Sequence, residues 1–436
     1  MHTPLTSPLP RPSEPPGPVT GLLLTGGGAR AGYQIGVLQG IARIARDAGA
    51  PCGQGGASPF QVIAGTSAGA INAAALACRS DRFDHAVADL TDVWANFHAE
   101  QVYRADSLAV IRTGAPWLTM MSFGWALARF RKLRPRSLLD NGPLEALLQR
   151  MVPFDRLPAL MAAGHLHALA VTASSYTTGQ HVTFYESPHE LPPWTRSQRI
   201  AVRSPIGVRH LLASSAIPFL FPAMPLDMSQ DHEWFGDGSM RQAAPISPAV
   251  HLGAERILVI GAGRLHEPNE RQVPGNGYPS VAQIAGHALS NIFLDALAVD
   301  VERLQRINAT LSLLPAEARA RTPLRPIDAL VIAPTQRLDD LAGPHIDSLP
   351  LTIRTLLRAV GVSGTAQAGG MARGSALASY LLFESAYTRE LIALGLADTL
   401  ARRDEVLRFF GWSSPAGSAG RRDPLGERLP TLAVPA

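Results

Sequence analysis

Two short apolar segments, each followed at once by a glycine-rich turn and a helical pattern, constrain the fold of this chain most. The first runs into Gly26-Gly-Gly28 and the second into Gly65-Thr-Ser-Ala-Gly69. A strand that leads directly into a helix is part of a β-α-β unit, and such units build parallel sheets with helices on both faces. Apolar segments at 256–262 and 328–333 extend the pattern. We therefore expect an α/β fold with three α/β/α layers, a mainly parallel central sheet and additional C-terminal helices.

The second turn carries a serine in a Gly-x-Ser-x-Gly pattern. Ser67 follows the apolar residues 60–64 and precedes a run of small residues at 68–77. A serine on a sharp strand-to-helix turn presents its hydroxyl to a substrate, as the nucleophile of many hydrolases does. Gly65 and Gly69 supply the small neighbours that such a turn requires. We interpret Ser67 as a nucleophile; the alternative is a purely structural turn.

A serine hydroxyl is a poor nucleophile unless a base removes its proton. The chain contains 13 histidines, but none stands in a motif that marks it as catalytic. Asp237 is the better candidate, because glycines at 236 and 238 allow a tight turn and a close approach to another part of the chain. The alternative is an ordinary Asp-Gly turn at the end of a strand.

Together these segments resemble the ordered motif set of the patatin-like phospholipases. The resemblance covers roughly residues 20–262 and rests on four motifs in the family's order: Gly26-Gly-Gly-Ala-Arg30 with Gly32, Gly65-Thr-Ser-Ala-Gly69, Ala213-Ser-Ser-Ala-Ile-Pro218 with Pro222, and Asp237-Gly238. Four motifs in order are far more specific than one alone. The chain departs from the family at Ser239, where a second glycine is more common, and this affects the conformation of the turn more than the chemistry.

The resemblance implies a serine lipid acyl hydrolase with a catalytic dyad in place of a triad. Ser67 is then the nucleophile and Asp237 the general base, in a turn completed by Gly238 and Ser239. The oxyanion hole is implied to lie in the first glycine-rich loop, at Gly26, Gly27, Gly28 and Arg30. Such an enzyme cleaves fatty-acyl esters of phospholipids or related lipids through an acyl-enzyme intermediate, without a metal or an organic cofactor. Its substrate lies at a membrane surface.

The organisation of the chain follows from its composition. Residues 1–18 and 413–436 are rich in proline, glycine and arginine and are expected to be disordered. Residues 19–275 should form the catalytic domain, in which 104–136 mix aromatic side chains with a basic run and could form a lid or interfacial segment; a core helix pair is the alternative. Residues 276–412 should form a helical extension with one further strand, packed on the catalytic domain, with long helices over 280–311 and 366–394.

Charge and cysteine content narrow the class of protein further. The net charge is +4, and the two cysteines, Cys52 and Cys78, do not indicate a disulfide framework. No apolar stretch has the length of a signal peptide or a membrane span. We expect a cytoplasmic protein with peripheral contact to anionic lipid and no nucleic-acid partner.

Several alternatives remain open at this stage. Ser67 could serve an α/β-hydrolase esterase with a later acid and a histidine such as His251 or His287. The acyl-enzyme could pass its acyl group to an acceptor other than water, which would make the protein an acyltransferase. A dinucleotide-binding module is disfavoured because Gly32 lies one residue too far along for the Gly-x-Gly-x-x-Gly pattern. A non-catalytic lipid-binding scaffold is disfavoured by the presence of both Ser67 and Asp237.

Overall fold

The computed structural model describes most of the chain, namely residues 17–104, 137–191, 194–228, 231–264, 280–292, 296–362 and 374–413. The segments 1–16 and 414–436, for which disorder is predicted, lie outside the described residues, as does the candidate lid apart from Arg104. None of the described helices combines the length and the apolar character needed to cross a membrane.

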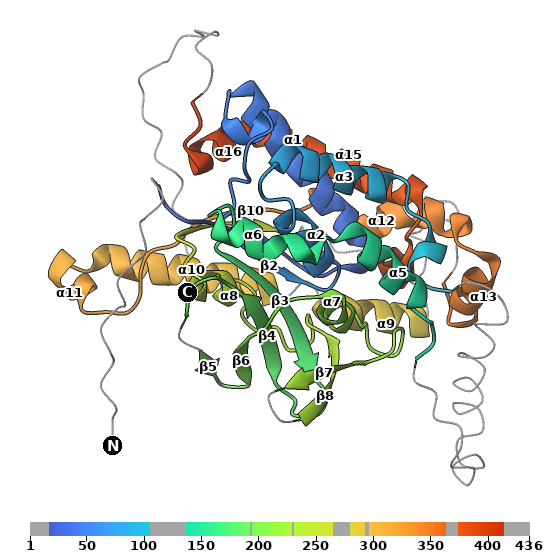
Figure 1. The fold of residues 1–436 in the computed structure, drawn as a ribbon. Helices are drawn as coiled ribbons and strands as arrows, with labels where there is room; N and C mark the ends of the chain where they lie inside the picture. The colour runs from blue at the N-terminus through green and yellow to red at the C-terminus, as the bar shows by residue number, and fades with distance from the viewer. Residues whose placement is uncertain are drawn as a thin grey trace, which may run out of the picture.

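Ten strands of the described residues form one mixed sheet, shown in Figure 1. The strands are β1 (Thr20–Leu24), β2 (Val62–Thr66), β3 (Ala168–Ser175), β4 (His181–Glu186), β5 (Thr195–Arg196), β6 (Arg199–Arg203), β7 (Met224–Met228), β8 (Asp231–Asp237), β9 (Arg256–Ile260) and β10 (Asp328–Ile332). Their order is β10-β9-β1-β2-β3-β4-β6-β5, and the first five of these run parallel. The hairpin β7–β8 joins the sheet because β8 pairs with β3 in the antiparallel sense.

The helices are α1 (Gly32–Asp47), α2 (Ala68–Ala77), α3 (Phe83–Ala95), α5 (Gly142–Met151), α6 (Leu157–Ala162), α7 (Val208–Ser214), α8 (Ser247–His251), α9 (Val281–Ser290), α10 (Ala296–Leu313), α11 (Ala316–Ala320), α12 (Leu338–Ala342), α13 (Leu351–Ala359), α14 (Ser375–Leu381), α15 (Ser385–Ala401) and α16 (Arg403–Phe410). They lie on both faces of the sheet, with α1, α2, α3 and α15 on one face and α8 and α10 on the other.

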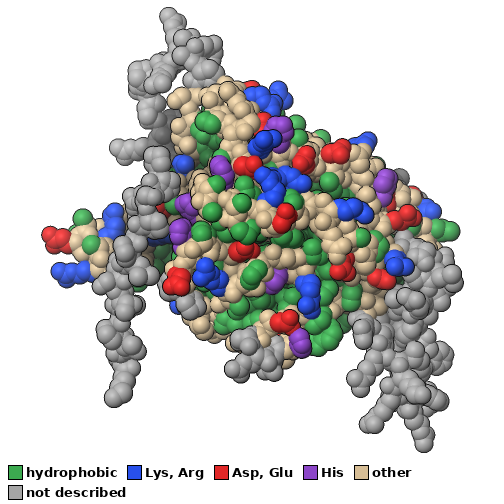
Figure 2. Space-filling model, viewed as in Figure 1, with side chains coloured by type: hydrophobic (Ala, Val, Ile, Leu, Met, Phe, Trp, Pro, Cys, Tyr) green, Lys and Arg blue, Asp and Glu red, His purple; other side chains and the backbone are tan. Residues whose placement is uncertain are grey.

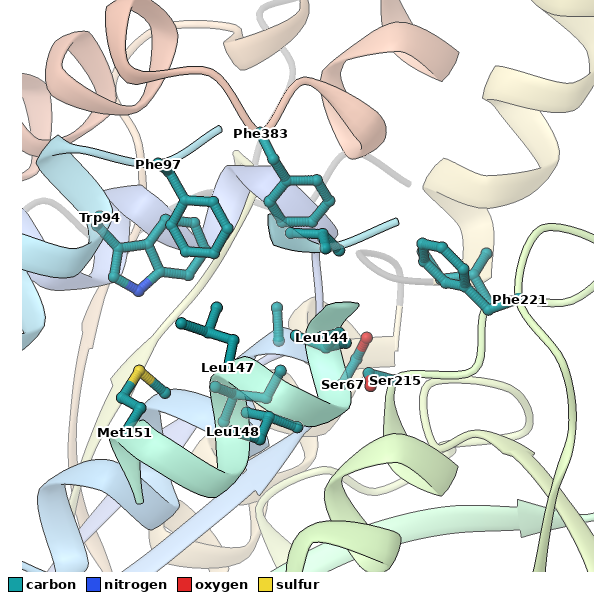
Figure 3. Close-up of a pocket in the computed structure, with 15 residues that line it drawn as sticks. Ser67, Trp94, Phe97, Leu144, Leu147, Leu148, Met151, Ser215, Phe221 and Phe383 are labelled. Atoms are coloured by element: carbon teal, nitrogen blue, oxygen red, sulfur yellow. The ribbon is translucent and has the colours of Figure 1, made fainter. Parts of the chain in front are cut away.

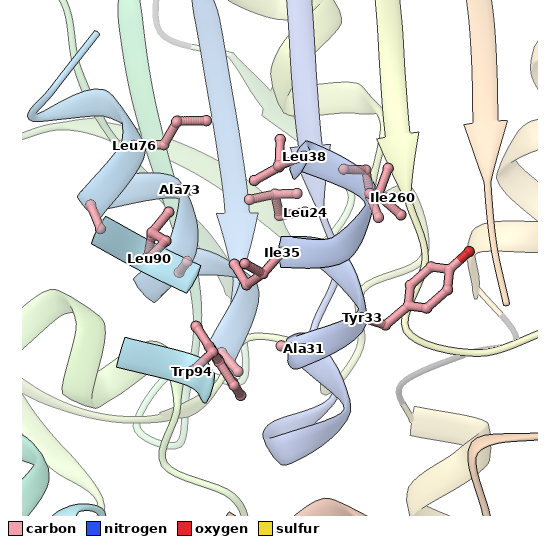
Figure 4. Packing of buried hydrophobic residues seen from close by; sticks show 14 of the residues in the cluster. Leu24, Ala31, Tyr33, Ile35, Leu38, Ala73, Leu76, Leu90, Trp94 and Ile260 are labelled. Carbon is pink, nitrogen blue, oxygen red and sulfur yellow. The ribbon is translucent and has the colours of Figure 1, made fainter. Parts of the chain in front are cut away.

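Alternation of side chains along β1 shows why the sheet needs both helical layers. Leu22 and Leu24 pack into the core beneath α1, where Figure 4 shows Leu24 beside Ile35. Leu23 points to the opposite face and packs into a second core that includes Leu252. Since successive side chains of a strand point to opposite faces, an apolar strand such as this one must be covered twice. The fold class predicted from the sequence, three α/β/α layers with additional C-terminal helices, is confirmed.

The C-terminal helix α15 packs so closely on α1 that the two backbones touch. A Cβ at Gly36 would lie 2.0 Å from the carbonyl oxygen of Ile392, and one at Gly395 would lie 2.2 Å from that of Tyr33. β10 also continues the central sheet beside β9. Among the described residues, β10 and α15 therefore belong to the same layers as the elements that precede them.

One of the two long helices predicted near the C-terminus is wrong in detail. The helix predicted over 280–311 corresponds to α9 and α10, and residues 293–295 between them lie outside the described residues. The helix predicted over 366–394 is interrupted, because α14 ends at Leu381 and α15 begins at Ser385. Phe383, in the interruption, is buried against the core, so tertiary packing overrides the local helical preference there.

Charged side chains of both signs are interspersed over the face of the molecule shown in Figure 2. Among the described residues on that face, the excess of positive charge is not gathered into one patch.

Candidate active site

The register of three strands brings Ser67 next to Asp237. β2 pairs with β3 as far as Thr66, which lies opposite Thr172. The chain then turns away at Ser67, and β8 takes the place beside β3, so that Asp237 lies opposite Ala173. Thr66 and Asp237 therefore occupy successive places beside β3, which brings Ser67 next to Asp237 although 170 positions separate these two in the sequence.

Ser67 occupies a sharp turn between β2 and α2. Its φ is +55° and its ψ −132°, a combination that costs a non-glycine residue about 1–3 kcal/mol. Two glycines make the turn possible. A Cβ at Gly65 would lie 2.5 Å from the carbonyl oxygen of Gly69, and one at Gly69 would lie 2.4 Å from that of Leu24. This close packing of strand, turn and helix holds the Ser67 side chain at the start of α2.

The Ser67 hydroxyl donates a hydrogen bond to the Asp237 carboxylate, with 2.5 Å between Oγ and Oδ2. The other carboxylate oxygen accepts a hydrogen bond of 2.8 Å from the backbone N–H of Ser239. The side chains of Ser67 and Asp237 are both buried. Burial disfavours the charged carboxylate and raises the pKa of Asp237 from 3.8 to about 6, although the hydrogen bonds from Ser67 and Ser239 oppose part of the rise. Such a carboxylate is ionised at neutral pH and accepts a proton more readily than an exposed one.

Ser214, in the third sequence motif, connects both residues of the pair. Its Oγ accepts a hydrogen bond of 2.8 Å from the Ser67 N–H and donates one of 2.6 Å to the carbonyl oxygen of Thr172. Its own carbonyl oxygen accepts a hydrogen bond of 3.1 Å from the N–H of Gly238, next to Asp237. Sequence reasoning assigned no role to Ser214, and the signal that could have found it is the third motif itself.

The glycine-rich loop after β1 lies beside Ser67. It leads into a short 3₁₀ helix, η1 (Gly28–Ala31), and Gly28 lines the same pocket as Ser67. A Cβ at Gly27 would lie 2.6 Å from that of Ala262, so this position is restricted to glycine. Within the described part of the chain, the amides of Gly27 and Gly28 donate no hydrogen bond. Backbone amides that donate no other hydrogen bond can stabilise negative charge on a carbonyl oxygen at Ser67.

Two other predicted residues of that loop are placed differently. Gly26 is buried between β1 and η1. The Arg30 side chain binds Ser379 and Asp339 rather than Ser67, so only its backbone lies in the loop. The structure therefore brings Gly28, but not the arginine side chain, to the pocket beside Ser67.

An apolar pocket extends from Ser67 between α2, α3, α5 and the interruption before α15 (Figure 3). It is narrow, with a cavity volume of about 30 Å³. It is lined by Gly28, Ser67, Ala68, Ile71, Trp94, Phe97, Val102, Leu144, Leu147, Leu148, Met151, Ser215, Ile217, Phe221 and Phe383. The hydroxyl of Ser215 donates to the carbonyl oxygen of Leu211. Ser67 is thus the polar group available at one end of a pocket whose other walls are apolar.

The histidines of the alternative triad lie elsewhere. His251 stacks on the Trp194 ring, with 4.8 Å between the ring centres, and His287 is exposed on α9. His181 lies behind the turn of Asp237, where its Nε2 is 3.0 Å from the carbonyl oxygen of Gly238. Burial lowers the pKa of His181 to about 4, so this ring is neutral at pH 7. No group of His, Cys, Asp or Glu among the described residues could hold a metal ion.

No match is found among curated proteins. Among solved structures, VipD from Legionella pneumophila is 13% identical over 90% of this chain and 67% of its own, with a TM-score of 0.32. The human GIVD cytosolic phospholipase A2 is 12% identical over 90% of this chain, with a TM-score of 0.39, and the alignment spans 62% of that enzyme. The type III effector protein ExoU is 15% identical over 94% of this chain and 91% of its own, with a TM-score of 0.25.

The family comparison is more direct. The model of the family described as patatin-like phospholipase matches residues 22–250, which include Ser67, Asp237 and the glycine-rich loop. Since these residues make up more than half of the sequence, the chain belongs to the patatin-like phospholipase family.

Proposed function

We propose that this protein is a serine lipid acyl hydrolase that cleaves fatty-acyl esters of phospholipids or related lipids, with Ser67 as nucleophile and Asp237 as general base. The observation that carries the proposal is the 2.5 Å hydrogen bond between the two side chains at the end of an apolar pocket. Membership of a family of lipid hydrolases supports it.

The reaction follows from the geometry in two halves. The ionised Asp237 takes the proton of Ser67 as Oγ attacks the acyl carbonyl, and the Gly27 and Gly28 amides stabilise the charge on the carbonyl oxygen. The intermediate expels the alcohol, which receives the proton from Asp237, and an acyl-enzyme remains. In the second half, Asp237 takes a proton from water, the resulting nucleophile attacks the acyl carbonyl, and Ser67 leaves with the proton. The products are a fatty acid and the free enzyme.

The pocket indicates the kind of substrate. Its apolar walls suit a hydrocarbon chain, with the ester carbonyl at Ser67 and the chain directed toward Met151 and Trp94 (Figure 3). Each buried methylene contributes roughly 0.8 kcal/mol to binding. Lipids with such chains are poorly soluble, so we expect a membrane surface to present them, with the net charge of +4 favouring anionic lipid.

The test measures fatty-acid release from mixed phospholipid vesicles and hydrolysis of a p-nitrophenyl ester. Ser67→Ala and Asp237→Asn should each lose activity on both substrates while remaining folded. Two matched controls, Ser80→Ala at a buried serine outside the pocket and Glu317→Gln at an exposed carboxylate, should retain it. Full activity of folded Asp237→Asn would refute the dyad, and release of acyl groups only to an added alcohol would identify an acyltransferase.

A further inference from the structure

The side chain of Arg30 is held by helices beyond the residues that match the family. It is buried, and its guanidinium forms an ion pair with Asp339 in α12. Its Nε donates a hydrogen bond of 2.8 Å to Ser379 Oγ in α14, and Nη2 donates one of 3.3 Å to the carbonyl oxygen of Ala376. The guanidinium carbon lies 3.9 Å from the centre of the Tyr380 ring, within the range of a cation–π contact. Arg30 therefore ties the loop after β1 to α12 and α14.

The same loop touches α14 a second time, at Gly28. A Cβ at Gly28 would lie 2.3 Å from the carbonyl oxygen of Tyr380, and its φ of +56° is one that glycine adopts readily. The loop thus contacts α14 directly through its backbone and indirectly through the side chain of Arg30. Because Gly28 also lines the pocket beside Ser67, the position of α14 determines where the Gly28 amide lies.

We propose that Asp339 and Ser379 are positioning residues that hold the oxyanion-hole amides of Gly27 and Gly28 in place through Arg30. This inference rests on the proposed function. A buried arginine without its carboxylate partner carries an uncompensated charge, so it shifts toward water and displaces its loop. A displacement of about 1 Å in a catalytic group lowers a rate by roughly 100-fold.

Substrate binding should respond differently from the chemical step. The segment after α14 supplies Phe383 to the pocket. The end of α14 next to it has a separate anchor, since the carbonyl oxygen of Leu381 accepts a hydrogen bond of 2.9 Å from the Tyr103 hydroxyl. This anchor does not involve Arg30 or Asp339. Loss of the ion pair should therefore lower kcat while the pocket walls, and with them KM, stay nearly unchanged.

The test compares Asp339→Asn and Ser379→Ala with the unchanged full-length protein on a short-chain p-nitrophenyl ester. We expect Asp339→Asn to lower kcat by about 10- to 100-fold with KM within about twofold, and Ser379→Ala to lower kcat by about 3- to 10-fold. The rate constant for modification of Ser67 by an alkyl fluorophosphonate should fall by the same factors, because the phosphoryl oxygen occupies the same hole.

Tyr33→Phe is the matched control. It removes a hydroxyl that donates a 2.9 Å hydrogen bond to Asp398 in α15, a contact to the C-terminal helices that does not involve the glycine-rich loop. It should lower the melting temperature but leave kcat within about twofold. An unchanged kcat in folded Asp339→Asn, or in Ser379→Ala if the first variant does not fold, would overturn the inference, as would an equal loss of kcat in Tyr33→Phe. An unchanged protein inert toward both reagents would instead refute the proposed function.

Discussion

Replacing Asp237 by asparagine should make the protein more stable at neutral pH while abolishing its activity. The carboxylate is buried, and its pKa of about 6 in the folded protein lies above the ordinary value of 3.8. The folded state therefore holds the proton more tightly than the unfolded state does. Below pH 3.8 both states are protonated and the group contributes no difference. As the pH rises through about 6, the folded state must accept a buried charge and loses stability.

The size of the effect follows from the two pKa values. A difference of one pKa unit corresponds to about 1.4 kcal/mol, so the buried charge destabilises the folded state by about 3 kcal/mol at pH 7.5. At pH 5 the carboxyl group is mostly protonated in the folded protein, and the same relation gives a destabilisation about half as large. An asparagine carries no charge, and its side chain can accept the hydrogen bond from Ser239 and donate one to Ser67. The gain should therefore approach these values.

Urea unfolding at pH 7.5 and pH 5 measures the prediction. Asp237→Asn should raise the free energy of unfolding by about 3 kcal/mol at the higher pH and by about half as much at the lower one. Glu317→Gln, at an exposed carboxylate on α11, should change it by less than about 0.5 kcal/mol. A gain that is the same at both pH values, or a loss of stability at pH 7.5, would refute the assignment of a destabilising buried charge to Asp237.

Three further predictions concern activity. The value of kcat/KM should rise with pH toward a plateau with an apparent pKa near 6, because Asp237 must be ionised to act as a base; a flat profile between pH 5 and 8 would contradict this role. Met151→Ala should shift the preference in a series of p-nitrophenyl esters toward longer chains, with roughly a fourfold gain in kcat/KM for each additional methylene that is buried, and an unchanged preference would place the chain elsewhere. His251→Ala and His287→Ala should each keep activity within about twofold, and a large loss in either would favour a triad.

The sequence predicted the parts of the site that depend on local pattern. The turn at Ser67 was recognisable because a strand, two glycines and a run of small residues adjoin it. Asp237 was recognisable from the glycines on both sides. The hairpin β7–β8, which carries Asp237 to its place, was not predicted. β7 contains Pro225 and Asp227, residues that are uncommon in strands, and its pairing depends on contacts distant in the sequence.

The partners of Arg30 lay beyond the reach of sequence reasoning for a different reason. Asp339 follows Arg30 by 309 positions and stands in no motif, so nothing local indicates that the two meet. The interruption at Phe383 is similar, since no glycine or proline precedes it within α14. Both features depend on how α14 packs. Packing between distant segments cannot be predicted from the hydrophobic periodicity of either segment.

The contact between α1 and α15 also sets the earliest point during synthesis at which α1 can pack on its partner helix. The hydrogen bond between Tyr33 and Asp398 joins residues 365 positions apart. Ribosomes add roughly 5–20 residues per second, so α1 waits roughly 20–70 s for its partner helix. For most of that interval the nascent chain contains Ser67 but has no α14 behind its glycine-rich loop. Hydrolytic activity should therefore appear only after α14 has been made and has packed behind that loop.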